Sequence, residues 1–167
     1  MKFAGAIMLV ASSATMGYLV SHKLSKRVAF LEQFLHFIAY IETEIRYSST
    51  LITEIIKGYK TEKELGYLLH DFYKILGTTG NINTSWDKAV RNTYKNFGLS
   101  LKEAETVINF IYNLGTNDIE GQMKYCRFNY ELIKEYLETA KDERRKKSKL
   151  YFMLYTSAGL CLTLSIV

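Results

Sequence analysis

The chain contains no proline, and only ten of its 167 residues are glycine. Proline removes a hydrogen bond from a helix interior and collides with the preceding turn, so its absence is typical of a largely helical protein. No segment longer than a few residues alternates between apolar and polar side chains, as a half-buried strand would. Together these absences predict an all-α fold, and the length predicts a single domain.

The sequence also lacks the residue clusters on which most enzyme chemistry depends. Its three histidines and two cysteines do not have the spacing of a metal site or of a nucleophile and its base. Glu32 and His36 are four residues apart, but a di-iron bundle needs two Glu-x-x-His pairs and two further glutamates. We therefore expect no enzyme activity, no metal and no cofactor. Cys126 and Cys161 are interpreted as packing residues.

Charged residues are missing from both ends of the chain, at 3–20 and 150–167. A helix of eighteen residues is about 27 Å long, which is near the lower limit for crossing a bilayer. A cleaved secretory signal is the alternative for the first segment, because residues 12–14 resemble a small-residue cleavage site. We favour two uncleaved anchors, at 1–21 and 150–167, because only Lys2 precedes the first segment whereas three basic residues follow it closely.

Basic residues gather beside these two apolar segments, in what we call the basic collars. The collar residues are Lys23, Lys26, Arg27, Arg144, Arg145, Lys146, Lys147 and Lys149. Between residues 28 and 140, by contrast, fifteen acidic residues outnumber twelve basic ones. This distribution favours contact with membrane lipids and argues against nucleic acid, whose footprint would lie across a folded face. By the positive-inside rule, residues 22–149 lie in the cytosol of a two-pass membrane protein, and both termini lie outside.

Two stretches carry matching heptad patterns, in which apolar residues recur at alternating spacings of four and three. The first stripe comprises Leu24, Val28, Leu31, Leu35, Ile38, Glu42 and Ile45, and the second comprises Ile119, Met123, Cys126, Tyr130, Ile133, Leu137 and Ala140. We expect helices at 22–47 and 118–149 to pair antiparallel through these stripes. Glu42 either leans to the edge while Ile41 shares the stripe, or fixes the register by meeting a partner such as Arg46.

Shorter helices are expected between the two long ones, at 50–59, 62–76, 84–97 and 101–114. Ser100 and Glu103 form a capping box, in which each side chain satisfies the other's free backbone N–H. The expected caps are Thr84 or Ser85 for the third short helix, Ser100 for the fourth, and Asn117 or Asp118 for the long final helix. Residues 77–83 have the composition of a loop. The predicted architecture is an antiparallel bundle of about six helices, whose two long helices continue into the terminal anchors.

Several motifs occur in a fixed order along the chain. They are Gly5 in the first apolar segment, Ile41-Glu-Thr-Glu-Ile45-Arg-Tyr47, Leu114-Gly-Thr-Asn-Asp118-Ile-Glu-Gly-Gln122, and the basic run before the second apolar segment. In this order and at this length, the whole chain resembles the stage III sporulation protein AB family of endospore-forming bacteria. The chain departs from the family where Leu51 follows Thr50 in place of proline, and where Asn117 replaces serine.

The resemblance implies a place in the mother-cell membrane around the engulfed forespore, within a channel complex similar to secretion machines. It also implies a cytosolic bundle similar to the F domain of type II secretion platform proteins, working beside a secretion-type ATPase and other subunits of the complex. The candidate partner-binding residues are then Glu42, Glu44, Asp118 and Gln122, which are polar and far from the membrane. The competing interpretation is that these four residues cap helices and hydrogen-bond the helix pair.

Two functions of different kinds fit these expectations. The first is a non-enzymatic platform or scaffold subunit that couples a cytosolic ATPase to a membrane channel. The alternative is a membrane-anchored helical sensor or signalling adaptor, which would need a ligand pocket or a sizeable outer domain. The predicted topology leaves only about two residues outside the bilayer, so an external ligand is disfavoured. The anchors can pair within one chain or between chains, so a homo-oligomer stays open.

Overall fold

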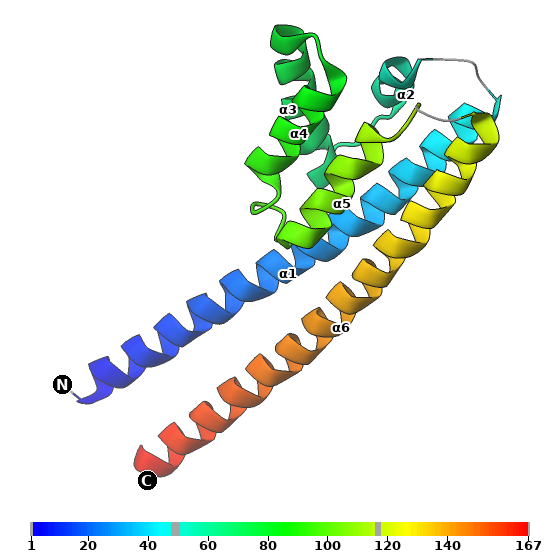
Figure 1. Cartoon of the computed structure of the whole chain (residues 1–167). Helices are drawn as coiled ribbons and strands as arrows, with labels where there is room; N and C mark the ends of the chain where they lie inside the picture. Colours follow the sequence, from blue (N-terminus) through cyan, green and yellow to red (C-terminus); the bar gives the residue numbers. More distant parts are fainter. Residues whose placement is uncertain (1, 48–50, 116–117, 167) are drawn as a thin grey trace.

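The computed structural model describes the backbone of residues 2–47, 51–115 and 118–166, and the side chains of residues 22–47, 51–115, 118–147 and 150. Within these ranges the chain forms six helices and no strand (Figure 1). They are α1 Lys2–Tyr47, α2 Ile52–Gly58, α3 Glu64–Thr79, α4 Ile82–Thr93, α5 Leu101–Tyr112 and α6 Ile119–Ile166. The predicted all-α fold and the predicted number of helices are confirmed.

Helices α1 and α6 are by far the longest elements, and they lie side by side in opposite directions (Figure 1). Both chain termini lie at one end of this pair. The end of α1 and the start of α6 lie at the other, which we call the distal end. Every apolar member of the α1 stripe is buried, as are Cys126, Ile133, Leu137 and Ala140 of the α6 stripe. The antiparallel pairing predicted from the two stripes is therefore confirmed.

A second face of α1 is buried as well, and the heptad pattern did not predict it. Its members are fully buried, are spaced four, three and four residues apart, and are Phe30, Phe34, Phe37 and Ile41. The ring centroid of Phe37 lies 6.2 Å from that of Trp86 in α4. The ring centroid of Phe34 lies 5.6 Å from that of Phe110 in α5. Helix α1 is thus enclosed by α6 on one face and by the short helices on another.

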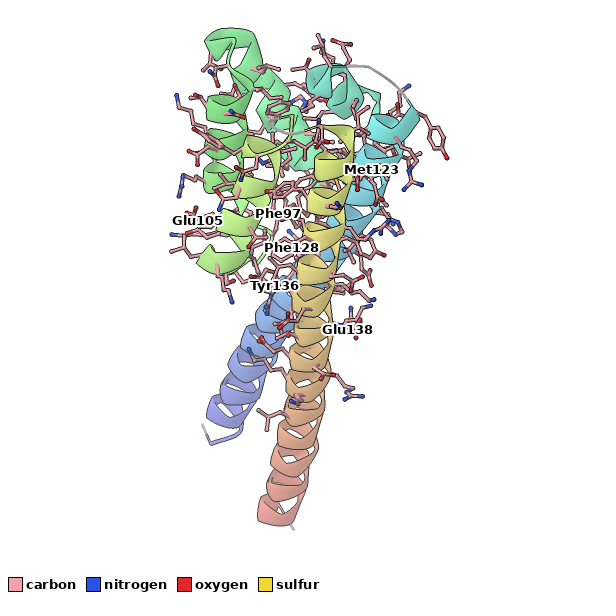
Figure 2. All side chains as sticks on the ribbon, turned by 45° about the vertical axis from the view of Figure 1, so that its right-hand side comes forward. Phe97, Glu105, Met123, Phe128, Tyr136 and Glu138 are labelled. Carbon is pink, nitrogen blue, oxygen red and sulfur yellow. The ribbon has the colours of Figure 1, made fainter. Side chains whose placement is uncertain are left out.

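The face of α6 that lies away from α1 is largely polar. Phe128 and Glu138 lie on this face and are exposed (Figure 2). Exposed ion pairs along it join residues three or four apart, such as Glu131 with Lys134 and Asp142 with Arg145. Pairs of this kind contribute about 0.3–0.5 kcal/mol each, so they favour the helix without fixing what it packs against.

Helix boundaries differ from the prediction mainly between residues 77 and 85. Helix α4 begins at Ile82 and is capped by Asn81, whose side chain accepts a hydrogen bond from the backbone N–H of Thr84 at 3.0 Å. The prediction of Thr84 or Ser85 as this cap was wrong, because asparagine is at least as good an N-cap and occurs earlier. Most of the predicted loop 77–83 is also helical, since α3 continues to Thr79. Helices α2 and α3 begin at residues 52 and 64, and position 50 lies outside the described residues.

The capping signals at the other two predicted helix starts are confirmed. Ser100 and Glu103 form the reciprocal capping box at the start of α5. The carboxylate of Asp118 accepts a hydrogen bond from the backbone N–H of Gly121 at 3.0 Å, as an N-cap of α6. Asn117, the other candidate for this cap, lies outside the described residues.

The turn at 94–98, between α4 and α5, ends in a left-handed glycine. The backbone N–H of Leu99 donates to the carbonyl of Tyr94 at 3.0 Å, and that of Gly98 donates to the carbonyl of Lys95 at 3.1 Å. These two bonds form a Schellman motif, which needs a residue with positive φ, and the φ of Gly98 is 74°. Gly98 therefore closes this segment, and α4 itself ends at Thr93, four residues before the predicted end at 97.

Across the described residues, we find no helix that combines the length and the apolarity that a bilayer crossing requires. Helices α1 and α6 continue along the chain into the two terminal apolar segments. The anchors at 1–21 and 150–167, and the cytosolic domain at 22–149, stay predictions.

Replacing Gly98 with alanine tests how the 94–98 turn is held against α1. An added Cβ at Gly98 would lie 2.7 Å from the backbone oxygen of Lys23, in a left-handed conformation that disfavours side chains. We expect Gly98→Ala to lower the free energy of unfolding by about 2 kcal/mol or more. Gly77→Ala is the matched control, because nothing lies within 4 Å of its Cβ position and it is inside α3. Gly77→Ala should raise the free energy of unfolding by about 0.5–1 kcal/mol. Urea unfolding of the full chain measures both, and equal midpoints would contradict the close contact.

Candidate functional site: the two ends of the bundle

A hollow of about 580 Å³ opens at the distal end, and we call it the distal groove. Helices α1, α2, α4, α5 and α6 all contribute to its wall, which is mostly aliphatic. Its main apolar lining residues are Ile45, Leu51, Ile52, Ile111, Leu114 and Ile119. Since no single helix forms this surface, it exists only when the bundle is folded.

Two lining residues of the distal groove are large, apolar and exposed. Leu51 is 74% exposed and Ile119 is 58% exposed. Ile119 is the first member of the α6 stripe, yet it lies at the groove instead of packing fully against α1. Exposed aliphatic side chains around a concave apolar surface are typical of a site that binds another protein. Periodicity could not reveal this site, because its residues come from five separate segments.

Glu42 connects α1 to α6 beside the groove. Its carboxylate accepts a hydrogen bond from Arg46 one turn later at 3.1 Å, and Arg127 of α6 lies 3.7 Å away. Ile41, the preceding residue, is fully buried, whereas the Glu42 side chain is 20% exposed. Both readings of Glu42 therefore hold in part, since it lies at the edge of the stripe and also meets a partner across the seam.

The other three candidate residues have different environments. Burial raises the pKa of Tyr40, and the negative charge of Glu44 on the same helix raises it further. Asp118 caps α6, and Gln122 lines the distal groove. The structure thus brings Gln122 to the groove and engages Glu42 and Asp118 in contacts within the chain. Partner binding by the four residues stays a prediction.

Cys126 lies in the α1–α6 seam near Glu42 and is fully buried. Burial, and secondarily the negative charge of Glu42, raises the pKa of this thiol to about 12. Both causes disfavour the thiolate, which is the reactive form of cysteine. Cys126 is therefore a packing residue in the folded chain, in agreement with its position on the stripe.

A buried ion-pair network, which we call the basal clamp, lies at the end of the bundle nearer the termini. The Arg27 guanidinium of α1 lies 2.9 Å from Glu103 of α5 and 3.1 Å from Glu143 of α6. The Glu103 side chain is only 2% exposed, and its second oxygen accepts hydrogen bonds from the backbone N–H and hydroxyl of Ser100. One guanidinium thus joins three helices, and the capping box completes the coordination of the buried carboxylate.

Most of the described collar residues are exposed, whereas the Arg27 side chain is only 13% exposed. Lys147 lies 3.8 Å from Glu143, and Arg145 pairs with Asp142 at 3.2 Å. Lys23, Arg144 and Lys146 are exposed, Lys26 is half-buried, and the side chain of Lys149 lies outside the described part. Arg27 thus makes structural contacts between helices, and lipid contact by the collar residues stays a prediction.

Within the described ranges, no group of three histidine, cysteine or carboxylate side chains is arranged to hold a metal ion. The predicted absence of enzyme activity is an expectation that these contacts do not test. The chemistry of the described side chains is that of binding: an apolar groove at one end and a cationic cluster at the other.

Replacing Arg27 tests the basal clamp. Arg27→Met leaves Glu103 buried without its cation, which typically costs about 3–5 kcal/mol. Lys26→Met is the matched control, because Lys26 is half-buried on the same turn and forms no ion pair with a described residue; its cost should stay within about 0.5 kcal/mol. Urea unfolding at neutral pH measures both variants. Adding Glu103→Gln to Arg27→Met should recover part of the loss, and no recovery would contradict the unpaired-charge explanation.

The Cys126 thiol provides a test of the α1–α6 seam. With Cys161 replaced by alanine, we expect alkylation of Cys126 at pH 8 to be at least about a hundred-fold slower than alkylation of a free thiol, because the thiol is fully buried and its pKa is raised from 9.0 to about 12. Unfolding in urea should restore full reactivity. A Cys126→Ala chain carrying Thr139→Cys, at an exposed position of α6, is the control that should react fast without urea. Equal rates at both positions would contradict a closed seam.

The raised pKa of the Cys126 thiol also predicts how the free energy of unfolding depends on pH. The folded thiol keeps its proton until about pH 12, whereas an unfolded thiol loses it near 9. The folded state therefore binds more protons between these values, and the contribution of Cys126 to the free energy of unfolding falls as pH rises from about 9 to about 12.

Comparisons with known proteins agree with the motifs that run along the chain. Residues 2–167 match the family described as Stage III sporulation protein AB (spore_III_AB). Searches of curated proteins and of solved structures gave no match. Because the family match extends over the whole bundle, with both long helices and both ends, the chain belongs to the stage III sporulation protein AB family and is a sporulation protein.

Proposed function

We propose that the chain is a non-enzymatic, membrane-anchored platform subunit of a secretion-like channel complex in endospore formation. In this proposal it couples a cytosolic secretion-type ATPase to the membrane channel. The observation that carries the proposal is the distal groove, an open apolar surface at the end of the bundle opposite to both chain termini (Figure 1). Membership of the sporulation family supplies the biological setting.

The arrangement of α1 and α6 supports the membrane part of the proposal. Because the two helices are antiparallel, both apolar segments lie at the same end of the molecule (Figure 1). The basic collars stand immediately beside these segments, where they would contact anionic headgroups and hold the bundle on the cytosolic side. The protein would then cross the mother-cell membrane twice, with both termini outside and the distal groove pointing into the cytosol.

The composition of the distal groove supports a protein partner. Its aliphatic wall offers a place to bury apolar side chains, while Glu42, Arg46 and Asp118 place charges near it. Interfaces commonly combine an apolar centre with a polar rim. The contacts that Glu42 and Asp118 make within the chain hold the rim in place, so the partner meets a surface that is already formed.

Replacing Ile119 tests whether the groove binds the ATPase. Ile119→Asp puts a charge on the rim, and because Ile119 is the first residue of α6, aspartate there also suits the helix dipole. We expect co-purification of the secretion-type ATPase from sporulating cells to fall at least about tenfold, since a buried unpaired charge costs more than 1.4 kcal/mol.

Leu101→Asp is the matched control for this experiment. Leu101 is the first residue of α5 and is 60% exposed, against 58% for Ile119, but it does not line the groove. It should leave both ATPase recovery and sporulation unchanged. If Ile119→Asp recovers as much ATPase as Leu101→Asp, with both variants folded by circular dichroism, the groove is not the docking surface.

A further inference from the structure

A second hollow, of about 380 Å³, lies at the basal end between α1, the 94–98 turn and α6, and we call it the basal pocket. Four cationic side chains from these three segments line it, together with two leucines. The cations are Lys23, Arg27, Lys95 and Lys147, and the leucines are Leu24 and Leu99. Lys95 belongs to neither basic collar and stands 49 positions from the nearest collar residue in the chain, Arg144.

The charges in the basal pocket do not balance. Glu143 is the one carboxylate in its wall, and it already accepts contacts from Arg27 at 3.1 Å and Lys147 at 3.8 Å. Glu103 lies behind Arg27 and neutralises it further. Neither Lys23 nor Lys95 has a carboxylate partner among the side chains that the structure describes. The pocket therefore carries about two uncompensated positive charges, which are arranged around a cavity.

The fold holds Lys95 beside α1 through the turn that contains it. Phe97 is buried, and its ring stacks on Phe30 of α1 with centroids 4.9 Å apart. The absence of a side chain at Gly98 lets the turn approach the backbone of Lys23, since a Cβ there would be 2.7 Å from its oxygen. The Schellman motif that fixes the turn uses the carbonyl of Lys95 itself. The backbone at Lys95 is thus fixed relative to Lys23.

The position of the pocket along the helices indicates its ligand. Lys23 lies three residues after the first apolar segment, and Lys147 lies three residues before the second. On a helix this is about 4.5 Å, so the pocket lies at headgroup depth if the two segments cross a bilayer. Lysine side chains that line one pocket together with buried leucines match a phosphate that is attached to an apolar molecule.

We propose that the basal pocket binds the phosphate of an anionic phospholipid. Lys95 is the residue outside the basic collars through which the folded bundle recognises that headgroup. This inference rests on the membrane anchoring in the proposed function. It adds a defined site to the diffuse attraction of the collars: the phosphate lies between Lys23, Lys95 and Lys147, while Arg27 holds the wall through its pairs with Glu103 and Glu143.

The test uses the full chain in a zwitterionic detergent, with dihexanoyl phosphatidylglycerol as the probe. We expect this lipid to raise the Tm of the native chain in a saturable manner, and we expect dihexanoyl phosphatidylcholine to have no such effect. Lys95→Ala should weaken the binding about tenfold, because one charge-assisted contact is lost. Lys88→Ala is the matched control: it removes the same charge from an exposed site of α4 that does not line the pocket. It should leave the affinity unchanged.

Two further measurements make each outcome decisive. Lys23→Ala should weaken binding as Lys95→Ala does, and circular dichroism reports whether either variant is folded. Inorganic phosphate at equal concentration distinguishes the source of the ligand: if it binds as tightly as the lipid, the site is one for free phosphate and the lipid proposal is overturned. Equal affinity of Lys95→Ala and Lys88→Ala also overturns it.

Fractionation separates this proposal from the proposed function. If the native chain is not recovered in membranes that have been washed with carbonate, the anchoring proposal fails, whatever the detergent titration shows. If it is recovered there but shows no preference for phosphatidylglycerol over phosphatidylcholine, the basal pocket proposal fails and the anchoring stands.

Discussion

The burial of α1 on two faces is the constraint on which the rest of the bundle depends. One face packs against α6, and the other carries three phenylalanines against the short helices. Burying one such side chain contributes about 1.5–3 kcal/mol, which exceeds any exposed ion pair in the molecule. The short helices need this support, because helices of seven to sixteen residues are marginal on their own in water. Without the aromatic face of α1, helices α2 to α5 have no common surface on which to form the distal groove.

Among the described side chains, three ion pairs of unequal strength join α1 to α6, and the middle one links Glu32 to Lys141 at 3.3 Å. At the basal end, Arg27 is largely buried and bridges two carboxylates, one of which is itself buried. At the distal end, Glu42 meets Arg127 at 3.7 Å, but the Arg127 side chain is 70% exposed. The exposed pair contributes at most about 1 kcal/mol, whereas breaking the buried network costs several. The network of Arg27 therefore ties α1 to both α5 and α6 at the base, whereas the two ion pairs farther along α1 and α6 are more exposed.

The long helices could be predicted from the sequence because their signal is local and repeated. The heptad stripes, the Ser100 capping box and the Asp118 cap each depend on residues within a few positions of one another. The second face of α1 was missed because Phe30, Phe34 and Phe37 lie on the same helix as the stripe, and only neighbouring helices show that both faces are needed. The distal groove and the basal pocket join segments that are far apart in the chain, so no local pattern predicts them. The ion pairs of Arg27 could not be predicted either, because its partners, Glu103 and Glu143, are distant in sequence.

The placement of the two sites at opposite ends of one helix pair has a mechanical consequence. Between Leu24 and Ile45, α1 spans about 31 Å at 1.5 Å per residue, and it is supported along this length by α6 on one face and aromatic packing on the other. A helix supported in this way keeps the distance between its ends nearly constant. The distal groove is present only in the folded bundle, so a partner bound there also stabilises the bundle by mass action. In the proposed function, docking at the distal end would therefore reinforce the same helix pair that positions the basal pocket.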